Sequence, residues 1–597
     1  MKNGEGNSLR LWPGVAAAVV LCLARFVLPP AAPDLAMFGI IGGVVCALAI
    51  LLWWLFFSRA PWSERIGAVI FIVVAIWATT LLADVSMRTG MRGMLLPIFG
   101  APLVTLALVA AVVATRRSSA TFRRAAVAIA ILLVCAGLAM LRTEGIKGSG
   151  SELAWRWTKT PEERLLAEPA IAALPPAATP VTTATAAPIA VASEKAQPPA
   201  SSPPQTELVT AEWPGFRGPQ RDSVVRGLRI NTDWSAAPPT ELWRRPIGPG
   251  WSSFAVAGDL LYTQEQRGND EIVACYKVST GEPVWSHRDP VRFWESNAGA
   301  GPRSTPTLNG SRVFALGATG ILNALDSATG RRLWSRNIAA DTDKAVPEWG
   351  FASSPLVIDN VVVVAAASAM AGYDADTGKP RWQVKGERGS YSSPHQVTVD
   401  GVVQVVMLSG AGAVAVDPAT GAELWKHPWE PGGSTIVQPA VMVGGDILIN
   451  GISGTGGHGI RRIAAARSAA GGWNTQERWT SSGLKPYFND FVVHKGHAYG
   501  FDGNILSCID LEDGKRKWKG GRYGNGQLVL LADQDVLLVL SEDGELALVS
   551  ATTGGYQEIA KRPALNAKTW NHPVVVRGTL LVRNGEEMAA FKLAALR

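Results

Sequence analysis

The sequence contains little that is typical of a hydrolase or a metalloprotease. It has no Gly-x-Ser-x-Gly string, which would indicate a serine nucleophile, and no His-Glu-x-x-His string, which would indicate zinc on a helix. Cysteine is scarce, and no two of the five cysteines are adjacent: they are Cys22, Cys46, Cys135, Cys275 and Cys508. From these absences we predict no metal site.

The excess of positive charge lies in the first quarter of the chain. The formal net charge is +7. Residues 1–150 hold 13 Lys and Arg against 5 Asp and Glu, whereas the remaining 447 residues hold 43 against 44. The downstream part therefore lacks the basic excess of a DNA- or RNA-binding domain, and we predict no nucleic-acid partner.

Five long apolar runs occupy the same first quarter. Each has 17 to 23 residues. At 1.5 Å per residue such a helix can cross a hydrocarbon core of about 30 Å. We predict a transmembrane helical module at residues 1–145, with spans at residues 11–28, 35–57, 66–83, 94–114 and 125–141.

The basic residues around these runs predict an orientation. Eight lie before the first run and in segments 58–65 and 115–124, whereas the alternate loops 29–34 and 84–93 hold two. Because short cytoplasmic loops carry the excess of Lys and Arg, we expect a cytoplasmic N-terminus. Five crossings would place everything after residue 141 in the periplasm. We therefore predict a multi-pass protein of the bacterial inner membrane.

A segment rich in Pro and Ala follows the membrane module. Residues 169–204 contain nine Pro, with Ala, Thr and Ser making up most of the rest. Such a composition cannot bury enough apolar surface to offset its ordering entropy, so we expect an extended, semi-rigid spacer. We assign residues 146–210 to a linker and residues 211–597 to a second domain.

A motif recurs about every 45 residues in the second domain. The unit is Ala-x-Asp-x-x-Thr-Gly-x-x-x-Trp. Clear copies end at Trp334, Trp382, Trp425 and Trp518, degenerate copies end at Trp285, at Trp479 and near Glu558, and an isolated last-strand Trp stands at Trp243.

Each unit divides into four short β segments, most clearly over residues 353–384. The Asp-x-x-Thr-Gly string lies between the third and fourth segments, where Gly provides a positive φ and the Asp and Thr oxygens can accept the amides of the turn. We expect the Trp of the fourth strand to cover this turn. Four strands per 40–50 residues indicate a propeller blade.

The termini of the domain predict how the ring closes. The last three predicted strands lack a fourth strand to complete a blade, and the predicted strand of Trp243 lacks the three other strands of its blade. Pairing them yields an all-β, eight-bladed propeller without a free edge. Cys275 and Cys508 occupy equivalent positions in non-adjacent blades, too far apart to bridge, so we expect buried thiols.

The repeats resemble those of the pyrroloquinoline-quinone-like (PQQ-like) repeat β-propellers over residues 213–593. The strings WPGFRGPQRD (213–222), GPRSTPT (301–307), EWGFASSP (348–355) and WNHP (570–573) look like those of PQQ-binding-like propeller proteins. A five-span anchor before eight blades is similar to membrane-bound quinoprotein glucose dehydrogenase. The propeller alone is similar to the outer-membrane assembly lipoprotein BamB. The resemblance is specific for fold and weak for function.

Similarity to quinoprotein dehydrogenases implies PQQ, Ca²⁺ and a site at the channel mouth. Two features of that pattern are absent, the adjacent Cys-Cys pair of many members and the Trp-Asp-x-Asp string. Polar residues that precede the innermost strands should crowd this mouth. Under the dehydrogenase hypothesis the base is Asp490, and the cofactor-binding residues are Asn489 as a Ca²⁺ ligand, Trp349 or Trp570 as the stacking platform, Arg303 at the quinone oxygens, and His572 nearby.

Two functions therefore stay open. The preferred hypothesis is a non-enzymatic propeller, anchored in the inner membrane, that binds an envelope protein, a peptide or another ligand. The alternative is a PQQ-dependent dehydrogenase that oxidises an alcohol or sugar and passes electrons to membrane ubiquinone. Five spans favour the alternative, since one helix suffices as an anchor, and the missing cysteine pair disfavours it.

Overall fold

The chain divides into two compact units. The computed structural model describes residues 9–32, 35–148, 150–168, 174–178, 211–386, 388–430, 432–453 and 456–596. One unit comprises residues 1–159 and 294–299, and the other comprises residues 160–293 and 300–597. Apart from residues 174–178, the Pro-rich spacer predicted at residues 169–204 lies outside the described residues.

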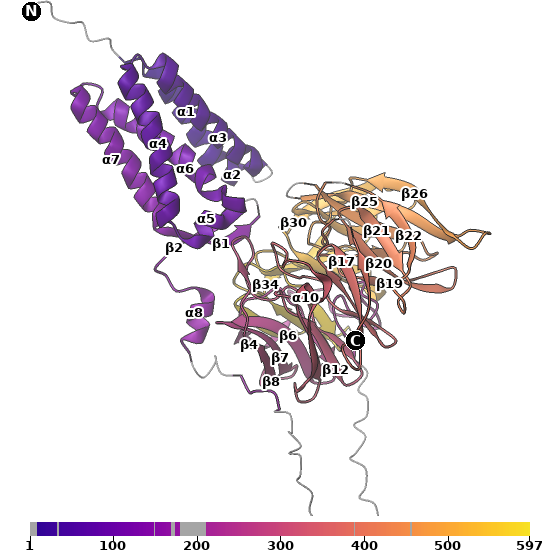
Figure 1. The fold of residues 1–597 in the computed structure, drawn as a ribbon. Helices are drawn as coiled ribbons and strands as arrows, with labels where there is room; N and C mark the ends of the chain where they lie inside the picture. The colour runs from indigo at the N-terminus through magenta and orange to yellow at the C-terminus, as the bar shows by residue number, and fades with distance from the viewer. Residues whose placement is uncertain are drawn as a thin grey trace, which may run out of the picture. The chain divides into compact units, whose positions relative to one another are not determined.

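The first unit is a helical bundle (Figure 1). Its five long helices confirm the predicted apolar runs, and each is long and apolar enough to cross a membrane. The first consists of α1 (Trp12–Cys22), a π-helical turn at Leu23–Val27 and α2 (Leu28–Ala31), and the second of α3 (Ala36–Leu52) and a π-helical turn at Trp53–Phe57. The other three are α4 (Trp62–Leu82), α6 (Leu95–Ala114) and α7 (Ala120–Ala139). A short helix, α5 (Val85–Thr89), lies between α4 and α6 in the chain.

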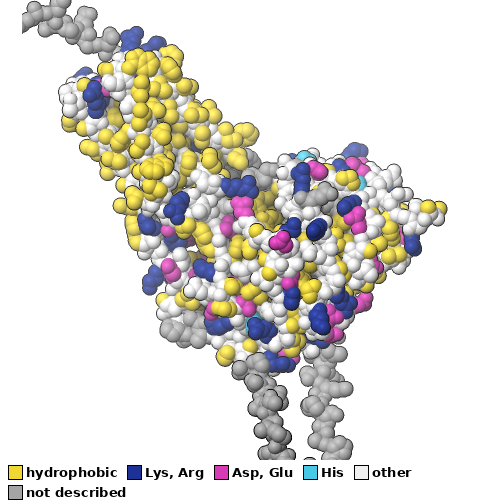
Figure 2. Space-filling view, in the orientation of Figure 1, with side chains coloured by type: hydrophobic (Ala, Val, Ile, Leu, Met, Phe, Trp, Pro, Cys, Tyr) yellow, Lys and Arg dark blue, Asp and Glu magenta, His cyan; other side chains and the backbone are white. Residues whose placement is uncertain are grey.

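The outer surface of this bundle is apolar. Leu82 and Leu133 are both 68% exposed, whereas Ile50 and Leu108 are fully buried. Figure 2 shows hydrophobic side chains over the sides of the unit and Lys and Arg at the end where the chain begins. Large apolar side chains that face outward on α1, α3, α4 and α7 fit a lipid environment and would be an aggregation liability in water.

Short elements connect the two units. Strands β1 (Leu141–Lys147) and β2 (Gly150–Trp155) form an antiparallel hairpin, and helix α8 (Pro161–Leu166) follows. Thr160 and Glu163 cap α8 reciprocally. Helix α8 belongs to the second unit, within which Glu162 pairs with Arg292 at 2.7 Å. Part of the region assigned to a linker is thus ordered.

The second unit is a ring of eight sheets, seven with four strands and one with five, which confirms the predicted propeller (Figure 1). Blades 1 to 4 consist of β5 (Ala255–Ala257), β6 (Leu260–Arg267), β7 (Asp270–Lys277), β8 (Pro283–Asp289); β11 (Thr307–Asn309), β12 (Arg312–Leu316), β13 (Ile321–Asp326), β14 (Arg332–Asn337); β15 (Leu356–Ile358), β16 (Val361–Ala366), β17 (Ala369–Asp374), β18 (Pro380–Lys385); and β19 (His395–Val399), β20 (Val402–Ser409), β21 (Gly412–Val416), β22 (Glu423–Pro428).

Blades 5 to 8 complete the ring. They consist of β23 (Ala440–Val441), β24 (Ile447–Ser453), β25 (Gly456–Arg467), β26 (Trp473–Ser481); β27 (Val492–His494), β28 (His497–Asp502), β29 (Ile505–Asp510), β30 (Arg516–Arg522); β31 (Gln527–Leu531), β32 (Val536–Leu540), β33 (Glu545–Ser550), β34 (Glu558–Pro563); and β35 (Val574–Val576), β36 (Thr579–Arg583), β37 (Glu587–Lys592) with β4 (Thr240–Pro246).

The ring closes as predicted, by pairing the two ends of the domain. Strand β4 is the outer strand of blade 8 and lies antiparallel to β37, with Trp243 opposite Ala590. A second contribution from the start of the domain is β3 (Val224–Val225), which lies parallel to β31 at the inner edge of blade 7. Pairing both ends into the ring protects backbone groups that a free edge would expose.

The turn of the repeat has the predicted chemistry. In blade 3, Asp374 Oδ1 accepts hydrogen bonds from Thr377 N at 2.9 Å and from Thr377 Oγ1 at 2.8 Å. Gly378 has a φ of +69°, which glycine adopts without a Cβ clash. The local side-chain hydrogen bonds make the turn largely independent of its surroundings.

The prediction that each Trp covers the turn of its own repeat is wrong. Trp334 on β14 of blade 2 donates from Nε1 to the carbonyl of Ala375 at 2.9 Å, in blade 3, and its ring packs over Gly378 of the same turn. A strand side chain stands roughly perpendicular to its sheet, so it points to the neighbouring blade, while its own turn lies along the strand. The Trp residues therefore join adjacent blades.

The two propeller cysteines are buried thiols, as predicted. Cys275 and Cys508 are both 0% exposed, and neither forms a disulfide. Burial raises the pKa of the Cys508 thiol to about 12. The Cys508 thiol is therefore protonated and unreactive at neutral pH.

The contact between Trp and glycine can be tested with two alanine substitutions. In Gly330→Ala the new Cβ would overlap the Trp285 ring of the preceding blade, at a φ of +70°. Gly401 has a φ of +75° but open space around its Cβ position. We expect Gly401→Ala to cost about 1–2 kcal/mol for the left-handed backbone. Gly330→Ala should lower the Tm clearly more, as measured by thermal unfolding of the full-length protein. Equal losses would contradict the inter-blade role of the Trp.

Candidate functional site

A segment at the start of the propeller crosses its central channel. We call residues 213–225 the crossing segment. Trp213 forms a bridge with Val256 of blade 1, and Pro214 accepts from the backbone N–H of Leu308 in blade 2. At its other end β3 pairs with blade 7. Between these ends the segment contacts blades 3, 5 and 6 through Arg217 and Arg221. It therefore spans the channel rather than following its rim.

Three residues of the crossing segment adopt a left-handed backbone. Arg217, Arg221 and Ser223 have φ values of +63°, +53° and +58°. Each such residue costs roughly 1–2 kcal/mol, so surrounding contacts must hold the segment in place. Those contacts come from the side chains of the two arginines, which are both buried.

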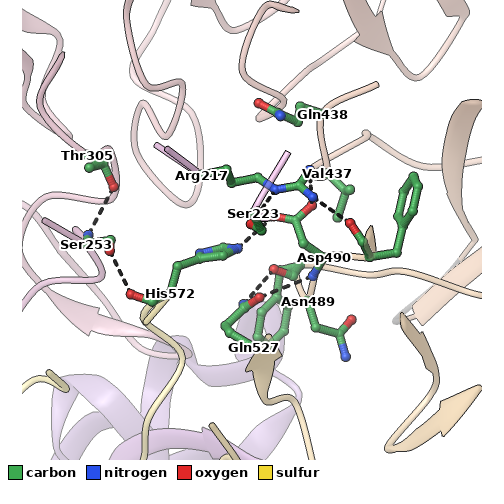
Figure 3. A network of polar contacts seen from close by, with 12 residues as sticks. Arg217, Ser223, Ser253, Thr305, Val437, Gln438, Asn489, Asp490, Gln527 and His572 are labelled. Carbon is green, nitrogen blue, oxygen red and sulfur yellow. Dashed lines mark hydrogen bonds and ion pairs between the residues drawn. The ribbon is translucent and has the colours of Figure 1, made fainter. Parts of the chain in front are cut away.

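Arg217, Asp490 and His572 form a buried ionic network inside the channel (Figure 3). Arg217 Nη1 lies 3.3 Å from Asp490 Oδ1, and both side chains are at most 2% exposed. His572 Nε2 lies 2.7 Å from Asp490 Oδ2. Arg217 also donates from Nε to Ser223 Oγ at 2.9 Å and from Nη2 to the carbonyl of Phe491. The network joins the crossing segment to blades 6 and 8.

The electrostatics of this network keep Asp490 ionised. Burial alone would raise the pKa of the carboxyl group, but attraction to Arg217 and the hydrogen bond with His572 outweigh it. The pKa of Asp490 therefore lies below its ordinary value. A carboxylate that is paired on both oxygens and has a lowered pKa is a weak proton acceptor.

The residues before the innermost strands form a belt of hydrogen bonds between blades. The backbone N–H of Ser253 donates to Thr305 Oγ1 at 3.0 Å, and that of Thr305 donates to Ser354 Oγ at 2.9 Å. Ser354 N–H donates in turn to Ser393 Oγ at 2.9 Å. Ser253 Oγ closes the belt toward blade 8 by donating to the carbonyl of His572 (Figure 3). Most polar residues of this belt thus form hydrogen bonds at the strand ends of neighbouring blades.

An aromatic collar surrounds the same mouth, built from Trp251, Trp349, Tyr391, Tyr487, Phe488 and Trp570. These side chains pack on one another. Trp349 and Tyr391 stack with ring centroids 5.5 Å apart, and Trp570 packs on Trp251 at 4.7 Å and on Phe488 at 4.9 Å. Trp570 is nearly buried, and the other five are half-buried. The collar is therefore a preorganised apolar surface with one edge in solvent.

Two cations lie on this collar. Arg303 donates from Nε to the carbonyl of Trp349 at 3.3 Å and lies over the ring of Phe293 at 5.1 Å. Lys568 Nζ lies 4.8 Å from the ring centroid of Trp570. Cations over aromatic rings are stabilised by the ring quadrupole even where they are partly desolvated.

The six residues of the dehydrogenase hypothesis gather at the channel, but their contacts do not fit PQQ and Ca²⁺. A calcium ion needs six to eight oxygen ligands, whereas the carboxylate of Asp490 faces a guanidinium and an imidazole. Asn489 accepts from the backbone of Tyr487 with its Oδ1. Trp349 and Trp570 are already stacked on other aromatic side chains. Among the described residues, no three His, Cys, Asp or Glu side chains could hold a metal together.

Comparison with known proteins agrees with this fold. Residues 291–520 match the family model described as outer membrane protein assembly factor BamB. BamB of Yersinia pestis is 24% identical over 330 residues, which cover 50% of this chain and 77% of the relative. A tetrathionate hydrolase of Acidithiobacillus ferrooxidans is 28% identical over 193 residues, covering 29% and 36%.

Solved structures with a similar chain course include two kinds of protein. BamB from Moraxella catarrhalis is 14% identical with a TM-score of 0.44, over 60% of this chain and 100% of that one. Quinohemoprotein alcohol dehydrogenase from Comamonas testosteroni is 13% identical with a TM-score of 0.46, over 64% and 81%.

The second unit is a tryptophan-docked propeller of eight blades, which defines its class. Over residues 291–520 its repeats are similar to those of PQQ-like repeat β-propellers. Its repeats are similar to those of BamB.

Sequence reasoning missed Arg217 and Arg221. Both lie in the string WPGFRGPQRD, from which only the resemblance to PQQ-binding-like propeller proteins was inferred. The string carried no signal that these side chains are buried, because arginine is mostly exposed in proteins. Their carbonyl partners at Pro355 and Phe491 are 134 and 274 residues away and could not be named from the sequence.

The role of Asp490 can be tested by its effect on stability. Asp490→Asn removes the counter-charge of a buried guanidinium, and breaking such a pair typically costs about 3–5 kcal/mol. We expect a large fall in the Tm of the full-length protein. Arg217→Met in the same chain should restore much of the loss, because the guanidinium that lost its counter-charge is then removed as well.

Asp222→Asn is the matched control. Asp222 pairs with Arg226 at 2.7 Å in the same segment, but both side chains are partly exposed. Such a pair contributes at most about 1 kcal/mol, so its loss should hardly change the Tm. An Asp490→Asn protein as stable as this control would show that the network is not a structural element.

Proposed function

We propose that this protein is a scaffold anchored in the bacterial inner membrane, whose periplasmic propeller binds an envelope protein or peptide at the aromatic collar. The observation that carries the proposal is the occupied channel. The crossing segment neutralises Asp490, and the collar remains as the surface around the mouth. The function is thus recognition at the mouth rather than chemistry in the channel.

The composition of the collar supports a protein or peptide partner. Aromatic residues and Arg are enriched where proteins bind one another, because they bury a large area with few rotatable bonds. The collar residues are held in place by packing on one another, so little conformational entropy is lost on binding.

The similarity to BamB supports the same class of function. The relatives of this repeat are named as outer membrane protein assembly factors, and assembly factors act on other proteins. This chain differs in carrying five long apolar helices before the propeller. We infer that these helices anchor the propeller to the inner membrane, with the N-terminus in the cytoplasm and residues beyond 141 in the periplasm.

The dehydrogenase alternative has less support. Its base would be Asp490, which is paired on both oxygens, and its stacking platforms would be rings already packed on neighbours. Transfer of electrons to ubiquinone would need a redox group at this site, and the residues present do not fit one.

The collar can be tested by photo-crosslinking in cells. A photoreactive amino acid at position 391, on the collar, should form a defined adduct with one envelope protein. The matched control is position 220, which is exposed on the crossing segment and should form no such adduct. In a further variant the photoreactive amino acid stands at position 487, also on the collar. There Trp349→Ala, which removes the stacking partner of Tyr391, should reduce the yield of the adduct. An adduct of equal yield from position 220, or none from the collar, would contradict the proposal.

The orientation can be tested with reporter fusions. Alkaline phosphatase fused after residue 160 should be active, because the enzyme folds only in the periplasm, while the same enzyme fused after residue 117 should be inactive. Fluorescent-protein fusions at the two positions should show the opposite pattern. Phosphatase activity confined to the fusion after residue 117 would overturn the proposed topology.

A further inference from the structure

A cavity lies between the crossing segment and the inner strands of three blades. Its volume is about 440 Å³, and its walls are the crossing segment from Pro214 to Arg221 and strands β11, β15 and β19. The strand residues in its wall, such as Asn309 and Thr398, lie toward the ends of their inner strands. The collar residues precede the inner strands, so this cavity is distinct from the collar. Its size is that of a small-molecule site.

Arg221 is a buried cation in the wall of this cavity that lacks a counter-charge. It is 9% exposed, and none of the described carboxylates lies within ion-pair distance. Nη1 donates to the carbonyl of Pro355 at 3.1 Å and Nη2 to that of Ser354 at 3.2 Å. Nε has no hydrogen-bond partner among the described residues. A guanidinium has five N–H donors, so donors remain for another acceptor.

His395 lines the same cavity and is also incompletely satisfied. It is 7% exposed, and its Nδ1 has no hydrogen-bond partner within the described chain. Burial, together with the nearby charges of Arg221 and Arg217, lowers the pKa of His395 to about 3. The imidazole is therefore neutral at pH 7 and can donate one hydrogen bond and accept another.

The two arginines of the crossing segment differ in their partners. Arg217 is balanced by Asp490, whereas Arg221 is held by carbonyl dipoles and lies 6.0 Å from the centroid of the Phe216 ring. Burial and repulsion from Arg217 lower the pKa of Arg221 to about 9. Burying a charge without an opposite charge costs several kcal/mol, so proteins that retain one usually place an anion beside it.

We propose that this cavity is a binding site for a small oxyanion, a carboxylate or a phosphate group, which pairs with Arg221 and hydrogen-bonds to His395. The planar fork of the guanidinium matches the two oxygens of such a group. The bound anion would neutralise the charge of Arg221, and it would tie the crossing segment to blades 3 and 4. The site is independent of the collar and of its partner.

The test is calorimetric titration of the detergent-solubilised full-length protein with succinate and with inorganic phosphate. The background salt is chloride at constant ionic strength, so that general screening is matched. We expect saturable binding of at least one anion and a rise in Tm with its concentration. Arg221→Gln should weaken binding by about tenfold or more, since it removes a charge-assisted hydrogen bond. Arg226→Gln, in the same segment but exposed and paired with Asp222, should leave the affinity unchanged.

A second variant covers the case in which Arg221→Gln fails to fold. Gln396 is exposed at the rim of the cavity, so Gln396→Glu should fold and would provide a carboxylate of the protein itself. Anion affinity should then fall at least as far as in Arg221→Gln, while the Tm without anion should rise or stay the same. Absence of saturable binding to the unmodified protein, or equal affinity in all four proteins, would overturn the proposal. Crosslinking at the collar is a separate readout, so the two proposals can fail independently.

Discussion

The contact between a Trp of one blade and the turn of the next is the interaction on which the propeller depends. At six blade interfaces the indole donates to a turn carbonyl in the following blade, as Trp285 does to Ser327 at 3.0 Å and Trp382 to Pro418 at 3.0 Å. The indole also packs where a glycine leaves room. Each contact fixes the distance and the rotation between two sheets. Repeating one such contact closes a ring, because every blade receives the same small rotation.

The two exceptions have local causes. The turn of blade 5 is expanded between β25 and β26, and Trp425 of blade 4 donates instead to Gln404 of its own blade at 2.7 Å. Blade 8 has no turn between its third and fourth strands, because β37 and β4 come from opposite ends of the domain. Correspondingly, the outer strand of blade 7 carries no Trp. At the closing seam Arg583 of β36 donates to the carbonyls of Gly248 and Gln264, so a buried guanidinium joins blade 8 to blade 1.

The crossing segment changes what the channel can do. A ring of eight sheets has polar strand ends around its axis, and these could line a pore or hold a cofactor. Here Arg217 and Arg221 fill the axis and bond to carbonyls of blades 3 and 6. Asp490, a carboxylate at the strand ends, is committed to this segment. The two binding surfaces that we propose are therefore the apolar collar around one mouth and the charged cavity at the crossing segment.

Much of the architecture followed from the sequence by itself. Five apolar runs, the spacing of Asp-x-x-Thr-Gly and Trp, and the unpaired strands at the two ends predicted the helices, the blade count and the closure, because each depends on local periodicity. Tertiary structure alone decided which blade a Trp covers, because the direction of the side chain depends on the geometry of its strand and not on which turn is near in sequence. It also decided the partners of the buried charges. Arg217 belongs to no repeat, and Phe491, 274 residues away, lies at the start of blade 6, so only the closed ring brings them together.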